Sequence, residues 1–137
     1  MSASTSTKHC LLVLCLLVLA TASQAKVHVY MTNDFGNKID LTVHCKSKND
    51  DLGAHLLHDK EVYQIAFNPN IWGTTRYFCS FEWTNEKKSF QRKSFDIYVY
   101  DRDSDRCADC RWLVRPTGPC YLNDQTGKID TCYGWNM

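Results

Sequence analysis

Hydrophobic and polar residues alternate with a period of two along most of the chain after residue 26, and no segment shows a helical period. The clearest example is 38–46 (KIDLTVHCK), where every second residue from Ile39 to Cys45 is apolar. This pattern predicts a strand with one buried and one solvated face. It predicts further strands at 27–31, 62–67, 76–83, 94–101 and 110–115, with shorter ones near Tyr121 and at 129–133.

Turn-forming residues separate these segments. The sequence NDFGN (33–37) lies between the first two strands and predicts a β-hairpin. Asn68-Pro69-Asn70 and Pro116-Thr117-Gly118-Pro119 each end a strand. Short strands joined in this way predict an all-β fold, a small antiparallel β-sandwich of about seven or eight strands. Trp72 lies too far after Cys45 for an immunoglobulin core, so a different sandwich topology is expected.

The N-terminal segment has the features of a signal peptide. Residues 10–20 (CLLVLCLLVLA) form an unbroken apolar run that is shorter than the roughly 20 residues of a membrane-spanning helix. Ser23 and Ala25 place small residues where a signal peptidase cleaves. We therefore predict a signal peptide at 1–25, a secreted domain at 26–137 and an extracellular location.

The charge balance argues against two classes of partner. The whole chain has a formal net charge of +1, and loss of Lys8 with the signal peptide leaves a neutral domain. A neutral domain has no long-range attraction for nucleic acid or for an anionic membrane. Nucleic-acid binding and membrane insertion are therefore not expected.

The secreted part retains an even number of cysteines: Cys45, Cys79, Cys107, Cys110, Cys120 and Cys132. In a small secreted domain this predicts a framework of up to three disulfides, whose pairing the spacing leaves open. Cysteines on the apolar faces of strands (Cys45, Cys79 and Cys110) could bridge the two sheets. Those near loops could close the C-terminal segment. Cys107-x-x-Cys110 also has the spacing of a zinc or redox pair, but secretion and the following strand favour disulfides.

Several blocks of the sequence, in order, resemble the plant self-incompatibility S-protein family and together cover nearly all of the secreted part. They are 43–53 (VHCKSKNDDLG) with His55 and Leu57, 73–83 (GTTRYFCSFEW), 95–98 (FDIY) with Arg102 and Asp103, 107–112 (CADCRW), 118–120 (GPC) and 132–135 (CYGW). The resemblance implies a secreted, disulfide-stabilised β-sandwich. It also implies a signalling ligand that acts through a cell-surface receptor or membrane protein, without a cofactor or enzymatic activity.

Two polar segments are the candidates for partner binding. They are 85–93 (NEKKSFQRK), with Lys87, Lys88 and Arg92, and 101–109 (DRDSDRCAD), with Asp103 and Arg106. Loops on a rigid scaffold commonly carry recognition residues, although each segment is equally well explained as a solvated turn.

The main alternative is a small secreted hydrolase or nuclease that uses His44, His55 and His58 for acid–base catalysis. A secreted defence protein is a further alternative. Asp50 and Asp51 favour a turn over a calcium loop, because adjacent carboxylates do not have the alternate spacing of calcium ligands. Trp72, beside Asn68 and Asn70, is a minor candidate for a sugar platform.

Overall fold

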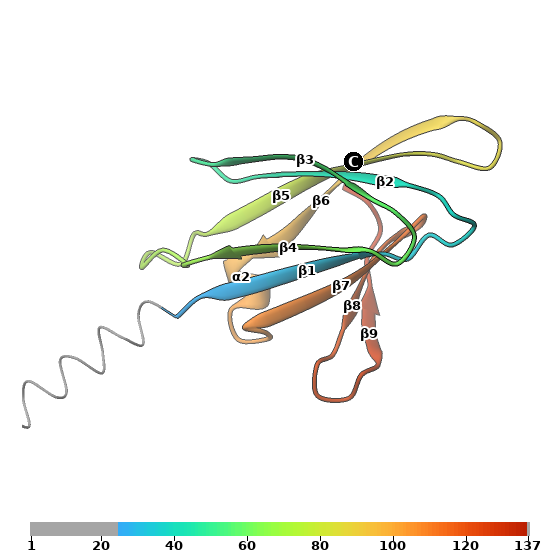
Figure 1. Cartoon of the computed structure of the whole chain (residues 1–137). Helices are drawn as coiled ribbons and strands as arrows, with labels where there is room; N and C mark the ends of the chain where they lie inside the picture. The colour runs from blue at the N-terminus through green and yellow to red at the C-terminus, as the bar shows by residue number, and fades with distance from the viewer. Residues whose placement is uncertain (1–24, 137) are drawn as a thin grey trace, which may run out of the picture.

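The computed structural model describes residues 25–136, so the predicted signal peptide at 1–25 lies outside the described part apart from Ala25. Two β-sheets pack face to face, with one helical turn between the sixth and seventh strands (Figure 1). The elements are β1 (Val27–Asn33), β2 (Leu41–Lys46), β3 (Asp51–Leu57), β4 (Val62–Phe67), β5 (Arg76–Thr84), β6 (Phe90–Val99), α2 (Tyr100–Asp103), β7 (Asp109–Arg115), β8 (Gly118–Leu122) and β9 (Ile129–Cys132).

The predicted all-β sandwich is confirmed, with nine strands in the described residues. One sheet has the order β4-β1-β7-β8-β9 and the other β3-β2-β5-β6. Every pair of neighbouring strands is antiparallel except β1 and β7, which run parallel. No helix within residues 25–136 has the length and hydropathy needed to cross a bilayer.

The predicted hairpin between the first two strands is wrong. β1 pairs with β4 and β7, whereas β2 pairs with β3 and β5, so residues 34–40 carry the chain from one sheet to the other. The fully buried Asn33 holds this crossing. Its Nδ2 donates to the carbonyls of Ile39 and Leu57 at 2.8 and 3.0 Å, and its Oδ1 accepts from the backbone N–H of Phe35 at 3.2 Å.

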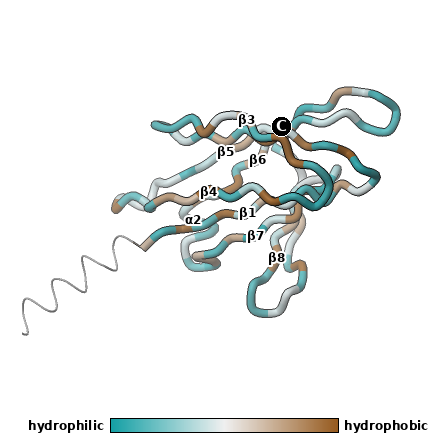
Figure 2. Tube along the Cα trace, in the orientation of Figure 1, coloured by the Kyte–Doolittle hydropathy of each residue, from teal (hydrophilic) through white to brown (hydrophobic). Residues whose placement is uncertain are grey.

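The alternating pattern forms the core as predicted. Inward-facing residues of both sheets are buried together, among them Val43, Phe81, Ile97 and Trp112. Figure 2 shows hydrophilic residues along the β5–β6 hairpin and the β8–β9 loop. Burial of the apolar face of each strand contributes roughly 25 cal/mol per Å² and is the main force that holds the two sheets together.

All six cysteines of the secreted part form disulfides: Cys45–Cys79, Cys107–Cys110 and Cys120–Cys132. The predicted framework is therefore confirmed, and its sulfurs are not free thiolates for zinc. The expectation that core cysteines bridge the sheets is wrong, because Cys45 and Cys79 face each other in register on neighbouring strands of one sheet. Cys120–Cys132 joins β8 to β9 and closes the C-terminal segment, as expected.

Candidate partner-binding surface

The β5–β6 hairpin carries two of the predicted binding residues on an ordered turn. The Asn85 Oδ1 accepts hydrogen bonds from the backbone N–H groups of Lys87 and Ser89 at 3.0 and 2.9 Å. The backbone N–H of Asn85 also donates to the Ser89 carbonyl at 2.9 Å. The side chain of Asn85 thus fixes the turn, which presents Lys87 and Lys88 to solvent.

The hairpin extends past the body of the sandwich (Figure 1). Phe90, directly after the turn, is 63% exposed and is not among the predicted binding residues. Arg92 lies on β6 rather than in a loop, because this strand begins at Phe90, four residues before the predicted start. Its Nε is 3.5 Å from the Glu82 Oε1 on the neighbouring β5.

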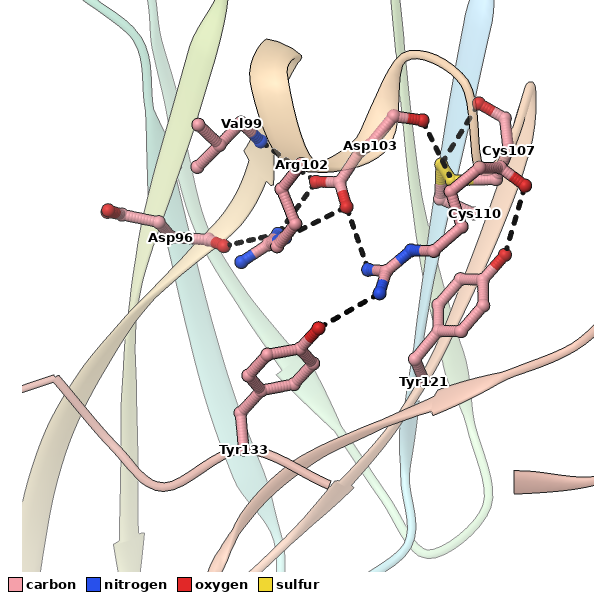
Figure 3. Close-up of polar contacts among 9 residues, drawn as sticks. Asp96, Val99, Arg102, Asp103, Cys107, Cys110, Tyr121 and Tyr133 are labelled. Atoms are coloured by element: carbon pink, nitrogen blue, oxygen red, sulfur yellow. Dashed lines mark hydrogen bonds and ion pairs between the residues drawn. A yellow bond between two sulfur atoms is a disulfide. The ribbon is translucent and has the colours of Figure 1, made fainter. Parts of the chain in front are cut away.

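The segment 101–109 has a different environment. Asp103 is completely buried and accepts hydrogen bonds from the side chains of two arginines (Figure 3). Arg102 donates to it from Nε at 2.8 Å and from Nη2 at 2.7 Å, and Arg106 donates from Nη2 at 2.7 Å. The backbone N–H of Val99 adds a fourth donor at 2.9 Å. The choice of Asp103 as a partner-binding residue is therefore wrong, since no part of its side chain reaches the surface.

Arg106 is also mainly a structural residue. Its Nη1 donates to the Tyr133 hydroxyl at 2.9 Å, and its guanidinium lies 3.9 Å from the centre of the Tyr121 ring. Such stacking of arginine on an aromatic face is attractive. Burial raises the pKa of the Tyr121 hydroxyl. Arg106 is thus held against the sandwich, and its side chain is only 23% exposed.

Each of the three candidate histidines has its own partner. His44 Nε2 lies 2.5 Å from the Asp51 Oδ1, and His58 Nδ1 lies 2.9 Å from the Asp40 Oδ1. The ring of His55 stacks on that of Tyr63 with 4.1 Å between the ring centres. The histidines are thus held separately, two in surface pairs with carboxylates and one against an aromatic ring.

Asp50 lies in the predicted turn, whereas Asp51 is the first residue of β3 and pairs with Lys46. The backbone N–H of Asp50 donates to the Ser47 Oγ at 3.1 Å, and the Asp51 Oδ1 accepts from the Gly53 N–H at 3.0 Å. The hydrogen bonds from Gly53 and His44 lower the pKa of the Asp51 carboxyl. From residue 25 to residue 136, no group of three or more His, Cys, Asp or Glu side chains is arranged to hold a metal ion.

The β4–β5 loop presents an apolar pair. Trp72 and its neighbour Ile71 are each 78% exposed. The Asn70 Oδ1 holds this loop by accepting from the backbone N–H groups of Trp72 and Thr74, both at 3.1 Å. Trp72 was a candidate sugar platform in the sequence analysis, and that role stays a prediction.

Comparison with known proteins gives a consistent result. The profile of the family described as "Plant self-incompatibility protein S1" matches residues 28–135. "S-protein homolog 5" of Arabidopsis thaliana is 48% identical over 107 residues, which cover 78% of this chain and 76% of the relative. "S-protein homolog 2" of the same plant is 44% identical over 117 residues, which cover 82% of this chain and 70% of the relative.

A solved structure has the same fold. It is described as that of "SPH (Self-Incompatibility Protein Homologue) proteins, a widespread family of small, highly stable, secreted proteins from plants". The TM-score is 0.56 at 20% sequence identity, and the match covers 85% of this chain and 99% of the other.

Proposed function

Because the chain belongs to the plant self-incompatibility protein S1 family, we propose that it is an extracellular signalling ligand that binds a cell-surface partner through the β5–β6 hairpin. Membership confirms the predicted resemblance. It also agrees with the predicted extracellular location, since the family is described as one of secreted proteins.

The observation that carries the proposal is the exposed hairpin itself. Asn85 orders its turn, so binding would cost less conformational entropy than it would for a mobile loop. Lys87 and Lys88 supply positive charge, and Phe90, two residues further along, supplies an exposed aromatic ring. Aromatic residues are enriched among the residues that dominate binding energy at protein interfaces, and charges beside them favour a partner of opposite sign.

The proposal assigns no catalysis to the histidines. His44, His55 and His58 are held by different partners on different elements, and this argues against one shared acid–base site. Asp103 drops out of the recognition surface because its carboxylate is buried.

The test is saturable binding of the labelled, oxidised 26–137 chain to plant cell surfaces, with a reduced and alkylated sample beside it. We expect binding by the oxidised form only, because the disulfides hold the scaffold that presents the hairpin. The double charge reversal Lys87→Glu/Lys88→Glu should weaken binding by about tenfold or more, which corresponds to about 1.4 kcal/mol.

The matched control is Lys48→Glu/Lys128→Glu, which makes the same change of charge at two other exposed lysines. The control should bind within about twofold of the unmodified chain, a difference of less than about 0.5 kcal/mol. Equal binding by the hairpin variant would place recognition elsewhere on the molecule. Absence of saturable binding by the oxidised chain would contradict the ligand proposal as a whole.

A further inference from the structure

A second surface feature lies over the outer face of the four-stranded sheet and around its β6 edge. A hollow of about 680 Å³ lies over β2, β5, β6 and the C-terminal segment. Its floor is a row of polar residues, in which Ser80 on β5 pairs with His44 on one side and with Ser94 on the other. Asn136 continues the row, since it forms an antiparallel bridge with Ser94 at the outer edge of β6.

The side chains that line this hollow and carry a full charge at neutral pH are all basic: Lys46, Arg92 and Lys93. His44, Lys46, Arg92 and Lys93 line it, and none of the lining residues is acidic. The nearest acidic partners lie outside the lining. Asp51 pairs with His44 at 2.5 Å and with Lys46 at 3.8 Å, and Glu82 pairs with Arg92 at 3.5 Å. Lys93 enters no ion pair within the described residues. A secreted domain of zero formal net charge thus has a locally basic hollow, which favours an anionic ligand.

The uncharged residues that line the hollow indicate which kind of anion it would bind. Ser80, Ser94 and Asn136 offer hydroxyl and amide groups, and Phe78 and Trp135 offer aromatic surface. The Trp135 indole is held in place, since its Nε1 donates to the Pro116 carbonyl at 2.9 Å. A sugar acid needs this combination: cations for its carboxylates, hydrogen-bonding groups for its hydroxyls and an apolar surface for the C–H face of its ring. The volume is within the range of about 300–1,000 Å³ that is typical of small-molecule sites.

We propose that this hollow binds a short acidic oligosaccharide whose sugar rings carry carboxylates, with Lys46, Arg92 and Lys93 as the residues that hold its charge. The hollow lies along the strands of the same hairpin, but Lys87 and Lys88 at its turn do not line it, so the two proposed sites use different residues. The site would retain the secreted protein on acidic glycans independently of any receptor.

The test uses a short oligomer of galacturonic acid as the probe, with the neutral galactose oligomer of the same length beside it. Affinity is measured by calorimetry, and the location by amide chemical shifts of the isotope-labelled, oxidised 26–137 chain. We expect the acidic oligomer to bind, the neutral one to bind at least about tenfold more weakly, and the affinity to fall as salt is added. The shift changes should concentrate on Ser80, Ser94 and Asn136.

The variant Lys46→Gln/Arg92→Gln/Lys93→Gln should lose about tenfold or more in affinity for the acidic oligomer. The matched control Lys38→Gln/Lys48→Gln/Lys128→Gln removes the same charge from other exposed positions and should bind like the unmodified chain. Three results would overturn the proposal: equal binding of the acidic and neutral oligomers, equal loss in both variants, or equal affinity for a single-stranded oligonucleotide of the same charge. The last result would show a general polyanion surface without a site for sugar rings.

Discussion

The segments 85–93 and 101–109 have similar compositions and opposite environments. Each is dense in charged residues and lies next to a predicted strand. Each therefore has the composition of a solvated loop. In the structure the first becomes an exposed hairpin. The second folds inward, so that Asp103 is fully buried with two arginines around it (Figure 3).

The difference arises from the aromatic residues that surround the second segment. The guanidinium of Arg102 lies 5.2 Å from the ring centres of both Phe95 and Trp112, and that of Arg106 lies over Tyr121. The hairpin has no comparable group of rings around its lysines among the described residues. Local charge density therefore does not decide whether a segment is available to a partner. The decision depends on what the rest of the chain packs against it.

The largest expected effect follows from removing the buried carboxylate. Asp103→Asn leaves Arg102 and Arg106 partly buried without their counter-charge, and loss of one partner from a buried ion network typically costs about 3–5 kcal/mol. The free energy of unfolding should fall by that amount, measured by urea denaturation of the oxidised 26–137 chain. This is a large share of the roughly 5–15 kcal/mol of a typical domain.

Asp101→Asn and Asp105→Asn are the matched controls in the same segment, because both carboxylates are exposed. Each should change the free energy of unfolding by less than about 0.5 kcal/mol. If Asp103→Asn is as mild as these controls, the arginines are stabilised by their aromatic contacts alone and the carboxylate is dispensable.

Much of the fold could be predicted from the sequence because the alternation of apolar residues is a local signal. The strands from Val62 to Phe67 and from Arg76 to Thr84 were found almost to the residue. β3 was missed, since only Leu57 among its residues is buried and Gly53, with a φ of 77°, interrupts its pattern. No strand was predicted at 51–57, where this edge strand lies.

The partners of the strands could not be predicted in the same way. β1 lies parallel to β7, which is more than 80 residues further along the chain, and no local pattern carries that information. The burial of Asp103 also depends on residues outside its own segment, because its arginine partners contact Trp112 on the next strand and Tyr133 in the C-terminal segment. The exposure of Lys87 and Lys88 could be predicted from local information alone, which is why both remain candidates for partner binding after the structure is known.

A smaller effect is expected at the hairpin. Asn85→Ala removes the oxygen that accepts the N–H groups of Lys87 and Ser89, and loss of a comparable helix cap costs about 0.5–2 kcal/mol. We expect a loss of about 1 kcal/mol in the free energy of unfolding. Amide hydrogen exchange should be faster at Lys87 and Ser89.

Asn85→Asp keeps the acceptor oxygen and should retain both the stability and the slow exchange. If Asn85→Ala exchanges as slowly as the unmodified chain, the turn is held by its backbone hydrogen bond alone. In that case the side chain of Asn85 does not pre-order the hairpin, and the entropic argument for its role in binding is lost.

The smallest expected effect on stability is at the exposed pair of His58 and Asp40. There the carboxylate mainly changes the pKa of the histidine. The Asp40 carboxylate accepts a hydrogen bond from His58, and this bond raises the pKa of His58 above 6.5, with smaller contributions from the charges of Asp40 and Glu61. Since the folded-state pKa is raised, the pair stabilises the fold fully below about pH 6.5, and this contribution is lost as the pH rises through the folded-state pKa. The side chains of His58 and Asp40 are 63% and 51% exposed, so solvent screens the pair and the change in stability should be barely detectable.

In an NMR titration, Asp40→Asn should move the pKa of His58 back toward 6.5, whereas Asp59→Asn should leave it in place. An unchanged pKa in Asp40→Asn would show that the pair does not form in solution. The expected result would show that a surface carboxylate mainly adjusts the proton affinity of its partner, whereas the buried Asp103 mainly determines whether the fold is stable.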